Sequence, residues 1–481
     1  MTIQASMDHP VAVIGGGPVG LAALAHLVAR GIPARLYESG ETVATSVRDW
    51  GHVRTFSPWR YDVDGAARRL LEKHGWFHPP RDVMPTGDVL YRFYLKPLAE
   101  IPEMASSIET KARVTAITRL GIDKVTSRDR AERPFVLTVT RADGSVRRDL
   151  ARAVIDASGT WTNQNPLGAG GVVAEGECEH ADRIAYGIPD VLGRDRKDYA
   201  GKRVLVVGAG YSGGNVLLDL ARLAETEPAT AITWAIRSAT PVRVYGGGNE
   251  DGLPARGELG ADVKALVDSG RVDLVTRFAA TAVREAGGGL TLEGELAGGP
   301  VRLGPFDRIV VVTGQRPDLD LTRELRLELD PWLESAKALG PLIDPNVHSC
   351  GSVPPHGHRE LAHPEPGFYT VGVKSYGRAP TFLLLTGHEQ ARSVVAAIAG
   401  DIAAADNVEL VLPETGVCSS RTANADESAG RCCGGPAPER ADACCKADAT
   451  AKDAGAEGCG CGCGTSAAKA PPERAPAKVS A

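Results

Sequence analysis

Two glycine-rich turns, each set between an apolar strand and an apolar helix, constrain the fold of this chain more than any other feature. They contain Gly15, Gly17 and Gly20 in the first turn, and Gly208, Gly210 and Gly213 in the second. The first glycine of such a turn permits a tight bend, the second lets the backbone approach a pyrophosphate, and the third lets helix and strand pack closely. An isolated glycine triplet is often an ordinary turn, but here the surrounding strand, helix and second strand all occur in order. Each turn therefore predicts a dinucleotide-binding unit.

The hydrophobic pattern around these turns predicts an α/β fold with two Rossmann-like dinucleotide-binding domains, one inserted in the other. The expected elements are strands at 11–14, 34–37, 153–156, 204–207, 232–236, 306–312 and 367–373, helices at 21–28, 216–224 and 383–398, and a hairpin turning at 143–144. We expect the first domain in residues 8–165 and 305–405, the inserted domain in 166–304 with its core in 200–304, and a disordered cysteine-rich tail in 406–481.

The residue that ends the second strand of each unit predicts which nucleotide is bound. Glu38 occupies this place in the first unit, where a carboxylate accepts hydrogen bonds from ribose hydroxyls and repels a 2′-phosphate. Arg237 occupies it in the second unit, with Arg243 shortly after, and a guanidinium suits a 2′-phosphate. The alternative is that Arg237 binds no phosphate and is simply a solvated arginine at a strand end. Two such sites in one chain imply electron transfer from a nicotinamide to a flavin, so we expect FAD at the first site and NADPH at the second.

Charge and hydropathy exclude two classes of partner. The formal net charge of -6 offers no basic surface for nucleic acid. The first ten residues carry no basic segment followed by an apolar core, and no run approaches the ~18 apolar residues of a membrane span. We therefore expect a cytoplasmic protein without nucleic-acid or membrane partners.

Two short motifs add a family resemblance. The stretches Ala157-Ser158-Gly159-Thr160-Trp161 and Thr313-Gly314-Gln315-Arg316-Pro317 each follow an apolar strand. With the glycine turns, they make residues 10–405 resemble the class B flavin monooxygenases and their relatives. The resemblance implies that Ser158, Gly159, Gly314 and Gly372 lie at the FAD. The family's usual Gly-Asp is absent, since Val373 and Lys374 follow Gly372.

A narrower resemblance concerns the flavin monooxygenases encoded with arsenic-resistance genes. It is carried by residues 186–193 (YGIPDVLG), by residues 374–380 (KSYGRAP) and by the cysteine-rich tail. Residues 174–186 also resemble a degraded form of the monooxygenase fingerprint, in which Ala174 and Ile184 replace the aromatic residues of the motif.

The distribution of cysteines favours an oxygenase over a disulfide reductase. A resident redox disulfide needs a cysteine pair beside the flavin, but residues 1–177 contain no cysteine, Cys178 stands alone before the second glycine turn, and Cys350 is the only other cysteine before the tail. The reduced flavin then passes electrons to O₂, and a C4a-(hydro)peroxyflavin attacks a soft nucleophile such as sulfur or trivalent arsenic.

Several side chains are candidates for contact with the flavin, although none is identified as a general acid or base. Trp50, His52, Arg54 and Trp59 follow the first unit, and Lys374 and Arg378 belong to the 374–380 motif. The alternative places both tryptophans in the core, Arg54 on the surface and Arg378 in a structural salt bridge.

The tail supplies a second possible site. Its candidate ligands are Cys432, Cys433, Cys444, Cys445, Cys459, Cys461 and Cys463, with Cys418 an eighth thiol. Soft thiolates select soft ions. Trivalent arsenic takes three sulfurs and zinc takes four, and spacing alone does not choose between them. A low-complexity tail without a ligand is the third interpretation.

These patterns lead to three functional hypotheses. The first is an NADPH-dependent FAD monooxygenase that uses O₂ to oxidise a trivalent arsenical to its pentavalent form. The second is an N- or S-hydroxylase of a small metabolite with a metal-binding tail. The third is a metalloid-binding flavoprotein or metallochaperone.

Overall fold

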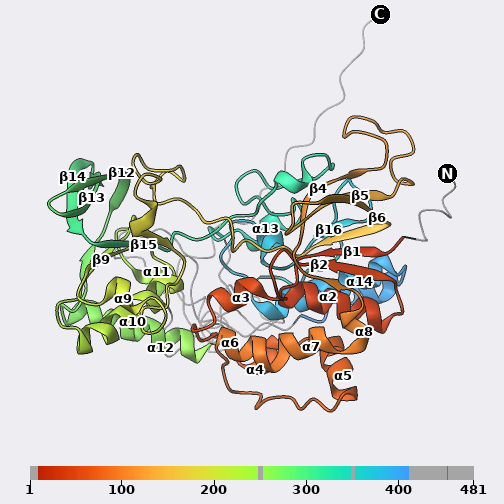
Figure 1. Ribbon diagram of the computed structural model, residues 1–481, viewed down its shortest axis with the longest axis horizontal. Coiled ribbons are helices and arrows are strands. Elements are labelled where there is room, and N and C mark those ends of the chain that lie inside the picture. The colour runs from red at the N-terminus through yellow and green to blue at the C-terminus, as the bar shows by residue number, and fades with distance from the viewer. Residues whose placement is uncertain (1–8, 247–252, 348–352, 411–451, 453–481) are drawn as a thin grey trace, which may run out of the picture. The chain divides into compact units, whose positions relative to one another are not determined.

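The computed structural model describes residues 9–246, 253–347, 353–410 and 452 (Figure 1). Its first sheet is five-stranded and wholly parallel, in the order β16-β7-β1-β2-β3. The strands are β1 (Val11–Ile14), β2 (Ala34–Tyr37), β3 (Ile108–Glu109), β7 (Ala153–Asp156) and β16 (Phe368–Thr370). The helices α2 (Pro18–Ala29) and α14 (Leu384–Ile398) pack against one another and bury the apolar side chains of this domain. Segments from both ends of the chain therefore build one sheet, as expected.

The second sheet is also five-stranded and parallel, in the order β11-β10-β9-β15-β8. Its strands are β8 (Ile184–Tyr186), β9 (Arg203–Val207), β10 (Ala231–Ala235), β11 (Asp273–Val275) and β15 (Arg308–Val311). The helices α10 (Tyr211–Thr226) and α12 (Pro254–Asp268) cover it (Figure 1). The α/β class with two dinucleotide-binding sheets is confirmed.

Two three-stranded antiparallel sheets accompany the parallel ones. The first contains β4 (Ala112–Arg119), β5 (Phe135–Arg141) and β6 (Val146–Ala151), with the expected hairpin turn at residues 143–144. The second contains β12 (Phe278–Ala286), β13 (Gly289–Leu296) and β14 (Gly299–Phe306). In the sequence between these two antiparallel sheets, α9 (Arg196–Tyr199) precedes β9 and α11 (Val242–Tyr245) follows β10.

The single strand expected at 306–312 is two strands in different sheets. Phe306 ends β14, whereas β15 pairs with β9 and β8, so the second sheet extends beyond the boundary expected at residue 304. The break lies at Asp307, whose carboxylate accepts hydrogen bonds from the Arg203 backbone amide at 2.7 Å and from its guanidinium. An apolar run marks a strand but does not show which neighbour it pairs with.

Short helices occupy the region between β2 and β3, where the hydrophobic pattern predicts no helix or strand. They are α3 (Thr45–Asp49), α4 (Trp59–Asp62), α5 (Gly65–Lys73), α6 (Gly87–Leu90), the π-helix η1 (Tyr91–Leu95), α7 (Lys96–Glu100) and α8 (Pro102–Ala105). After α14, α15 (Ile402–Asp406) ends the described body. In the part of the chain that the structure describes, no helix has the length and hydrophobicity needed to cross a membrane.

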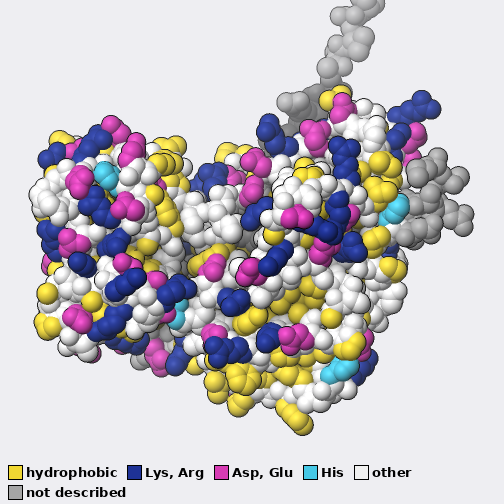
Figure 2. Space-filling view, viewed as in Figure 1, with side chains coloured by type: hydrophobic (Ala, Val, Ile, Leu, Met, Phe, Trp, Pro, Cys, Tyr) yellow, Lys and Arg dark blue, Asp and Glu magenta, His cyan; other side chains and the backbone are white. Residues whose placement is uncertain are grey.

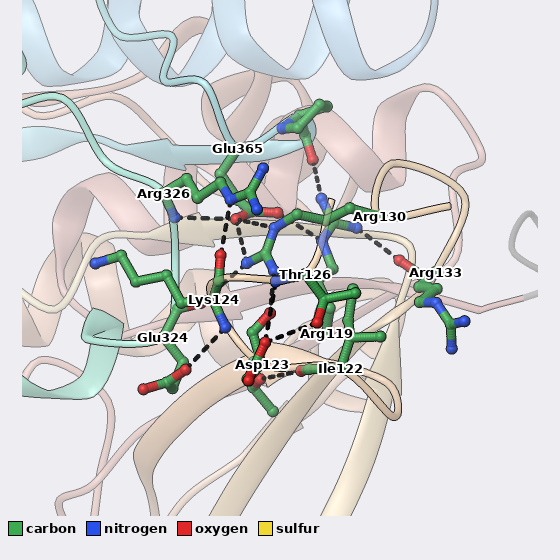
Figure 3. Close-up of polar contacts among 12 residues, drawn as sticks. Arg119, Ile122, Asp123, Lys124, Thr126, Arg130, Arg133, Glu324, Arg326 and Glu365 are labelled. Carbon is green, nitrogen blue, oxygen red and sulfur yellow. Dashed lines mark hydrogen bonds and ion pairs between the residues drawn. The ribbon is translucent and has the colours of Figure 1, made fainter. Parts of the chain in front are cut away.

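A buried ionic cluster ties three distant segments of the first domain together (Figure 3). The Glu365 carboxylate accepts hydrogen bonds from Arg119 Nε at 2.7 Å and from Arg130 at 2.7 and 3.0 Å, and the exposed fractions of these side chains are 0%, 2% and 5%. Glu365 also accepts a bond at 3.0 Å from the backbone amide of Arg326. The cluster thereby holds the segment around residues 324–326 against the β4–β5 hairpin.

Candidate functional site

The first glycine turn connects β1 to α2 at the carboxyl end of the sheet. Gly15 has φ +97°, and a Cβ placed there would lie 2.6 Å from the carbonyl oxygen of Ala157. A Cβ at Gly20 would overlap the carbonyl oxygen of Gly15. At Gly17, which caps the N-terminus of α2, a Cβ would meet nothing within 4 Å. Only the middle glycine therefore faces open space, as a pyrophosphate at a helix N-terminus requires.

Glu38 lies directly beside this turn. The residue is 8% exposed, and its carboxylate accepts hydrogen bonds from the backbone amides of Gly16 at 2.8 Å and Gly40 at 2.7 Å. Oε1 also accepts a 3.5 Å bond from the Ser39 hydroxyl, whereas Oε2 keeps a further lone pair for a hydroxyl donor. The turn and its carboxylate thus fit the pyrophosphate and ribose of FAD.

The second glycine turn repeats the same geometry. Gly208 has φ +133° and would clash with the Val312 backbone if it carried a Cβ, and a Cβ at Gly213 would lie 3.1 Å from the Gly208 oxygen. A Cβ at Gly210, the N-cap of α10, would meet nothing within 4 Å. The residues present here fit a second dinucleotide, since one open glycine again lies between two packed ones.

The two arginines predicted to recognise a 2′-phosphate lie at this second site. Arg237 lies two residues after the end of β10 and is exposed, and one of its nitrogens donates a 2.6 Å hydrogen bond to the Ala169 carbonyl oxygen. Arg243 is also exposed, on α11. A guanidinium has five N–H donors, so Arg237 keeps donors for a ligand phosphate.

The motifs at residues 157–161 and 313–317, called the two linker motifs below, lie in segments that run beside one another. The Asn165 amide donates to the Gly314 carbonyl oxygen at 2.9 Å, and the Arg316 amide donates to the Asn163 carbonyl oxygen at 3.0 Å. The Thr160 hydroxyl bonds Gln315 Oε1 at 3.0 Å. Residues far apart in the sequence therefore form one ribbon where the chain passes between the two sheets.

Three of the residues that the resemblance placed at the FAD come together at the carboxyl end of β7 and β16. Ser158 and Gly159 follow β7, whereas Gly372 begins the 3-10 helix η5 (Gly372–Tyr376) after β16. Lys374 joins the two segments, because its ammonium donates to Asp156 at 2.7 Å and to the Ser158 hydroxyl at 3.0 Å. Gly314, the fourth residue, is exposed on the second linker.

The other candidates for flavin contact lie in different environments. Trp59 is buried in the core at the start of α4, whereas Trp50 is half-buried, with its ring against Gly87. His52 is half-buried and lies near Asp219 of α10. Arg54 and Arg378 are exposed. Their contact with a flavin stays a prediction.

Asp62 is a buried carboxyl group that the sequence analysis did not single out. Its side chain accepts a 2.6 Å hydrogen bond from Ser57 and lies on α4, which packs against α14. Burial raises the pKa of Asp62 to about 7, although hydrogen bonds from Ser57 and Thr55 oppose the shift.

Replacing Asp62 by asparagine should therefore stabilise the protein at high pH. Because the folded pKa exceeds the unfolded value, the stability that the protonated carboxyl contributes is complete below pH 3.8 and is lost as the pH rises towards 7. We expect Asp62→Asn to exceed the wild type in unfolding free energy by up to about 4 kcal/mol at pH 8 and by little at pH 4. Urea unfolding across this range measures the difference, with the exposed Asp262→Asn on α12 as the control. A difference that does not change with pH would contradict the prediction.

The predicted tail ligands, from Cys418 to Cys463, lie outside the described residues. Within the described ranges, no group of three or more His, Cys, Asp or Glu side chains is arranged to hold a metal ion. Cys178, the one cysteine among the described residues, is free and exposed.

Comparisons with solved structures give the same fold at low sequence identity. Bacillithiol disulfide reductase from Bacillus cereus matches with a TM-score of 0.60 and 18% identity, over 82% of this chain and 99% of its own. The desferrioxamine-pathway cadaverine monooxygenase from Erwinia amylovora gives 0.58 and 13%, over 87% and 99%. An ornithine N-hydroxylase from Kutzneria gives 0.55 and 16%, over 82% and 99%. A comparison with curated protein sequences gives no match.

The family model described as pyridine nucleotide-disulphide oxidoreductase matches residues 9–363, a span that includes both glycine turns and both linker motifs. The two sites fit FAD and NADPH, in agreement with the expected cofactors. This chain is therefore an oxidoreductase that belongs to the pyridine nucleotide-disulphide oxidoreductase family.

Proposed function

We propose that the protein is an NADPH-dependent FAD monooxygenase that oxidises trivalent arsenicals to pentavalent ones. The assignment of monooxygenase activity rests on one observation. The chain combines two nucleotide sites with a sequence that has no cysteine before Cys178. A disulfide reductase that works through a resident redox disulfide needs a thiol pair next to the flavin. The choice of an arsenical as substrate rests on the thiols of the tail and on residues 186–193 and 374–380, which resemble the flavin monooxygenases encoded with arsenic-resistance genes.

Each nucleotide would be held mainly by backbone groups. The N-terminal amides of α2 and α10 face the open sides of Gly17 and Gly210 and would bind the two pyrophosphates. Glu38 would bind the FAD ribose, and Arg237 with Arg243 the 2′-phosphate of NADPH. Bound FAD supplies the chemistry, accepting a hydride from NADPH and delivering electrons to O₂.

The proposed reaction consumes one NADPH, one proton and one O₂ for each trivalent arsenical. One oxygen atom adds to the arsenic lone pair and the other leaves as water, while NADPH becomes NADP⁺. The test uses the purified full-length protein with FAD, NADPH and methylarsenite or arsenite. NADPH loss, O₂ uptake and arsenic speciation should agree. Substrate-dependent NADPH and O₂ consumption without a pentavalent product would contradict the proposal.

N-hydroxylation of a small amine is the second candidate. It is supported by the fold shared with the cadaverine monooxygenase and the ornithine N-hydroxylase. Cadaverine and ornithine therefore belong in the same assay, and a hydroxylamine product with no effect of arsenicals would favour this candidate. NADPH oxidation that needs a low-molecular-weight disulfide and no O₂ would instead indicate a reductase.

The tail would act by binding the metalloid through its thiols. Truncation after Pro413 removes all eight tail cysteines. Unchanged turnover with lost thiol-dependent metalloid binding would show sequestration, whereas a raised KM for the arsenical would show delivery to the flavin. Competition with Zn²⁺ during equilibrium dialysis compares the two ions, and a clear preference for Zn²⁺ would count against a metalloid site.

Arg237 should determine the preference for NADPH over NADH. A charge-assisted hydrogen bond contributes about 1.5–3 kcal/mol, so Arg237→Ala is expected to raise the KM for NADPH about ten- to a hundredfold. The KM for NADH, which lacks the 2′-phosphate, should stay within about twofold. Steady-state NADPH and NADH oxidation by the wild type, by Arg237→Ala and by the control Arg302→Ala on β14 measures the effect. Equal losses with both cofactors would show that Arg237 has a structural role.

A further inference from the structure

We propose that the Lys374–Asp156 ion pair positions the two segments that hold the flavin, and that Lys374 is a positioning residue without direct contact to the cofactor. The inference rests on FAD binding at the first site. Lys374 and Asp156 are 2% and 0% exposed, and the Lys374 nitrogen lies 2.7 Å from Asp156 Oδ2. A lysine this deeply buried and paired would have to break its ion pair to reach a ligand.

The pair is closed into a ring by Ser158. Asp156 Oδ1 accepts hydrogen bonds from the Ser158 hydroxyl at 2.7 Å and from its backbone amide at 3.1 Å, and the same hydroxyl accepts from Lys374 at 3.0 Å. Asp156 ends β7, and Lys374 lies in η5 after β16. The ring therefore fixes the chain at the carboxyl ends of two neighbouring parallel strands.

Both segments contain glycines that need such a constraint. Gly159 and Gly372 each have φ +73°, a conformation that glycine adopts at an entropic cost. Gly372 is held from its other side, since its amide donates to Gln390 Oε1 of α14 at 2.8 Å. Gln390 is itself bonded to Ser375 and to His356, so η5 is anchored by α14 on one side and by Asp156 on the other.

A covering segment leaves room for little water beside the pair. Leu319, Leu327, Leu329 and Ala336 line a cavity beside Asp156 and Lys374 that is large enough for about one water molecule. The Glu365 cluster of Figure 3 anchors this covering segment through Arg326. In such a low-dielectric surrounding a paired charge is strongly oriented, whereas an unpaired one is costly.

The test separates positioning from simple stability by means of a double variant. Lys374→Met and Asp156→Asn each leave an unpaired buried group, so both should unfold at lower temperature than the wild type. The double variant Asp156→Asn/Lys374→Met removes both charges and should recover most of the thermal stability. We expect this folded double variant to bind FAD at least about tenfold more weakly than the wild type. We also expect a changed circular dichroism spectrum in the flavin bands.

FAD titration of the full-length protein after removal of the cofactor measures the affinity, with Lys337→Met at an exposed ion pair as the matched control. Wild-type affinity and an unchanged flavin spectrum in the double variant would overturn the inference. Full stability of Lys374→Met combined with a loss of FAD binding would also overturn it, because Lys374 would then contact the cofactor directly. If the wild type itself bound no FAD, the proposed function would fail instead.

Discussion

Glu365→Gln is expected to lower the free energy of unfolding by about 3–5 kcal/mol, because it leaves two buried guanidiniums without a carboxylate. Arg119 and Arg130 both donate to this carboxylate, and Arg119 also lies 3.6 Å from the centre of the Phe135 ring. Neither guanidinium can turn towards water, since both are almost wholly buried. Urea denaturation at neutral pH measures the loss.

The same substitution at an exposed pair provides the control. Glu328→Gln removes a carboxylate that lies 3.6 Å from Lys337 and is 55% exposed, so its cost should stay below about 1 kcal/mol. Burial raises the pKa of Glu365, but hydrogen bonds from Arg130 and Arg119 outweigh it and hold the pKa below its usual range. The contribution of the ionised Glu365 carboxylate to the free energy of unfolding is therefore present at neutral pH and is lost only as the pH falls below that range. Equal losses in the two variants would contradict the argument.

Gly17→Ala and Gly210→Ala are expected to weaken nucleotide binding about ten- to a hundredfold while the fold stays intact. A methyl group at either position meets no protein atom within 4 Å, so thermal unfolding of the protein without cofactors should be nearly unchanged. The methyl would instead enter the space where a pyrophosphate approaches the helix N-terminus. An overpacked contact costs about 1–3 kcal/mol, which corresponds to a loss of affinity of about ten- to a hundredfold.

Each variant should affect one cofactor and spare the other. Gly17→Ala should weaken FAD and Gly210→Ala should weaken NADPH, as measured by titration of each nucleotide against both proteins. Gly20→Ala is the contrasting variant, because its methyl would overlap the Gly15 carbonyl oxygen and should destabilise the fold. Unchanged affinity in Gly17→Ala would place the FAD pyrophosphate elsewhere.

Much of the fold was predictable because each nucleotide-binding unit has a characteristic pattern within a short stretch of sequence. A short apolar run followed by the glycine turn predicted β1 and β9 to within a residue, since a parallel strand buried on both faces needs such a run. The pairing of β15 was not predictable, because it depends on which strand lies alongside. Lys374 illustrates the same limit at the candidate site, since its partner Asp156 stands 218 positions away.

The buried ring at the ends of β7 and β16 also limits which substitutions this chain can tolerate during evolution. A mutation that neutralises either Asp156 or Lys374 alone leaves the other charge stranded in an apolar interior. Selection would remove most such single mutants, and the two codons would change as a pair or remain fixed. We therefore expect this aspartate and lysine to occur together in relatives whose two strands end in the same ring, even at low overall identity.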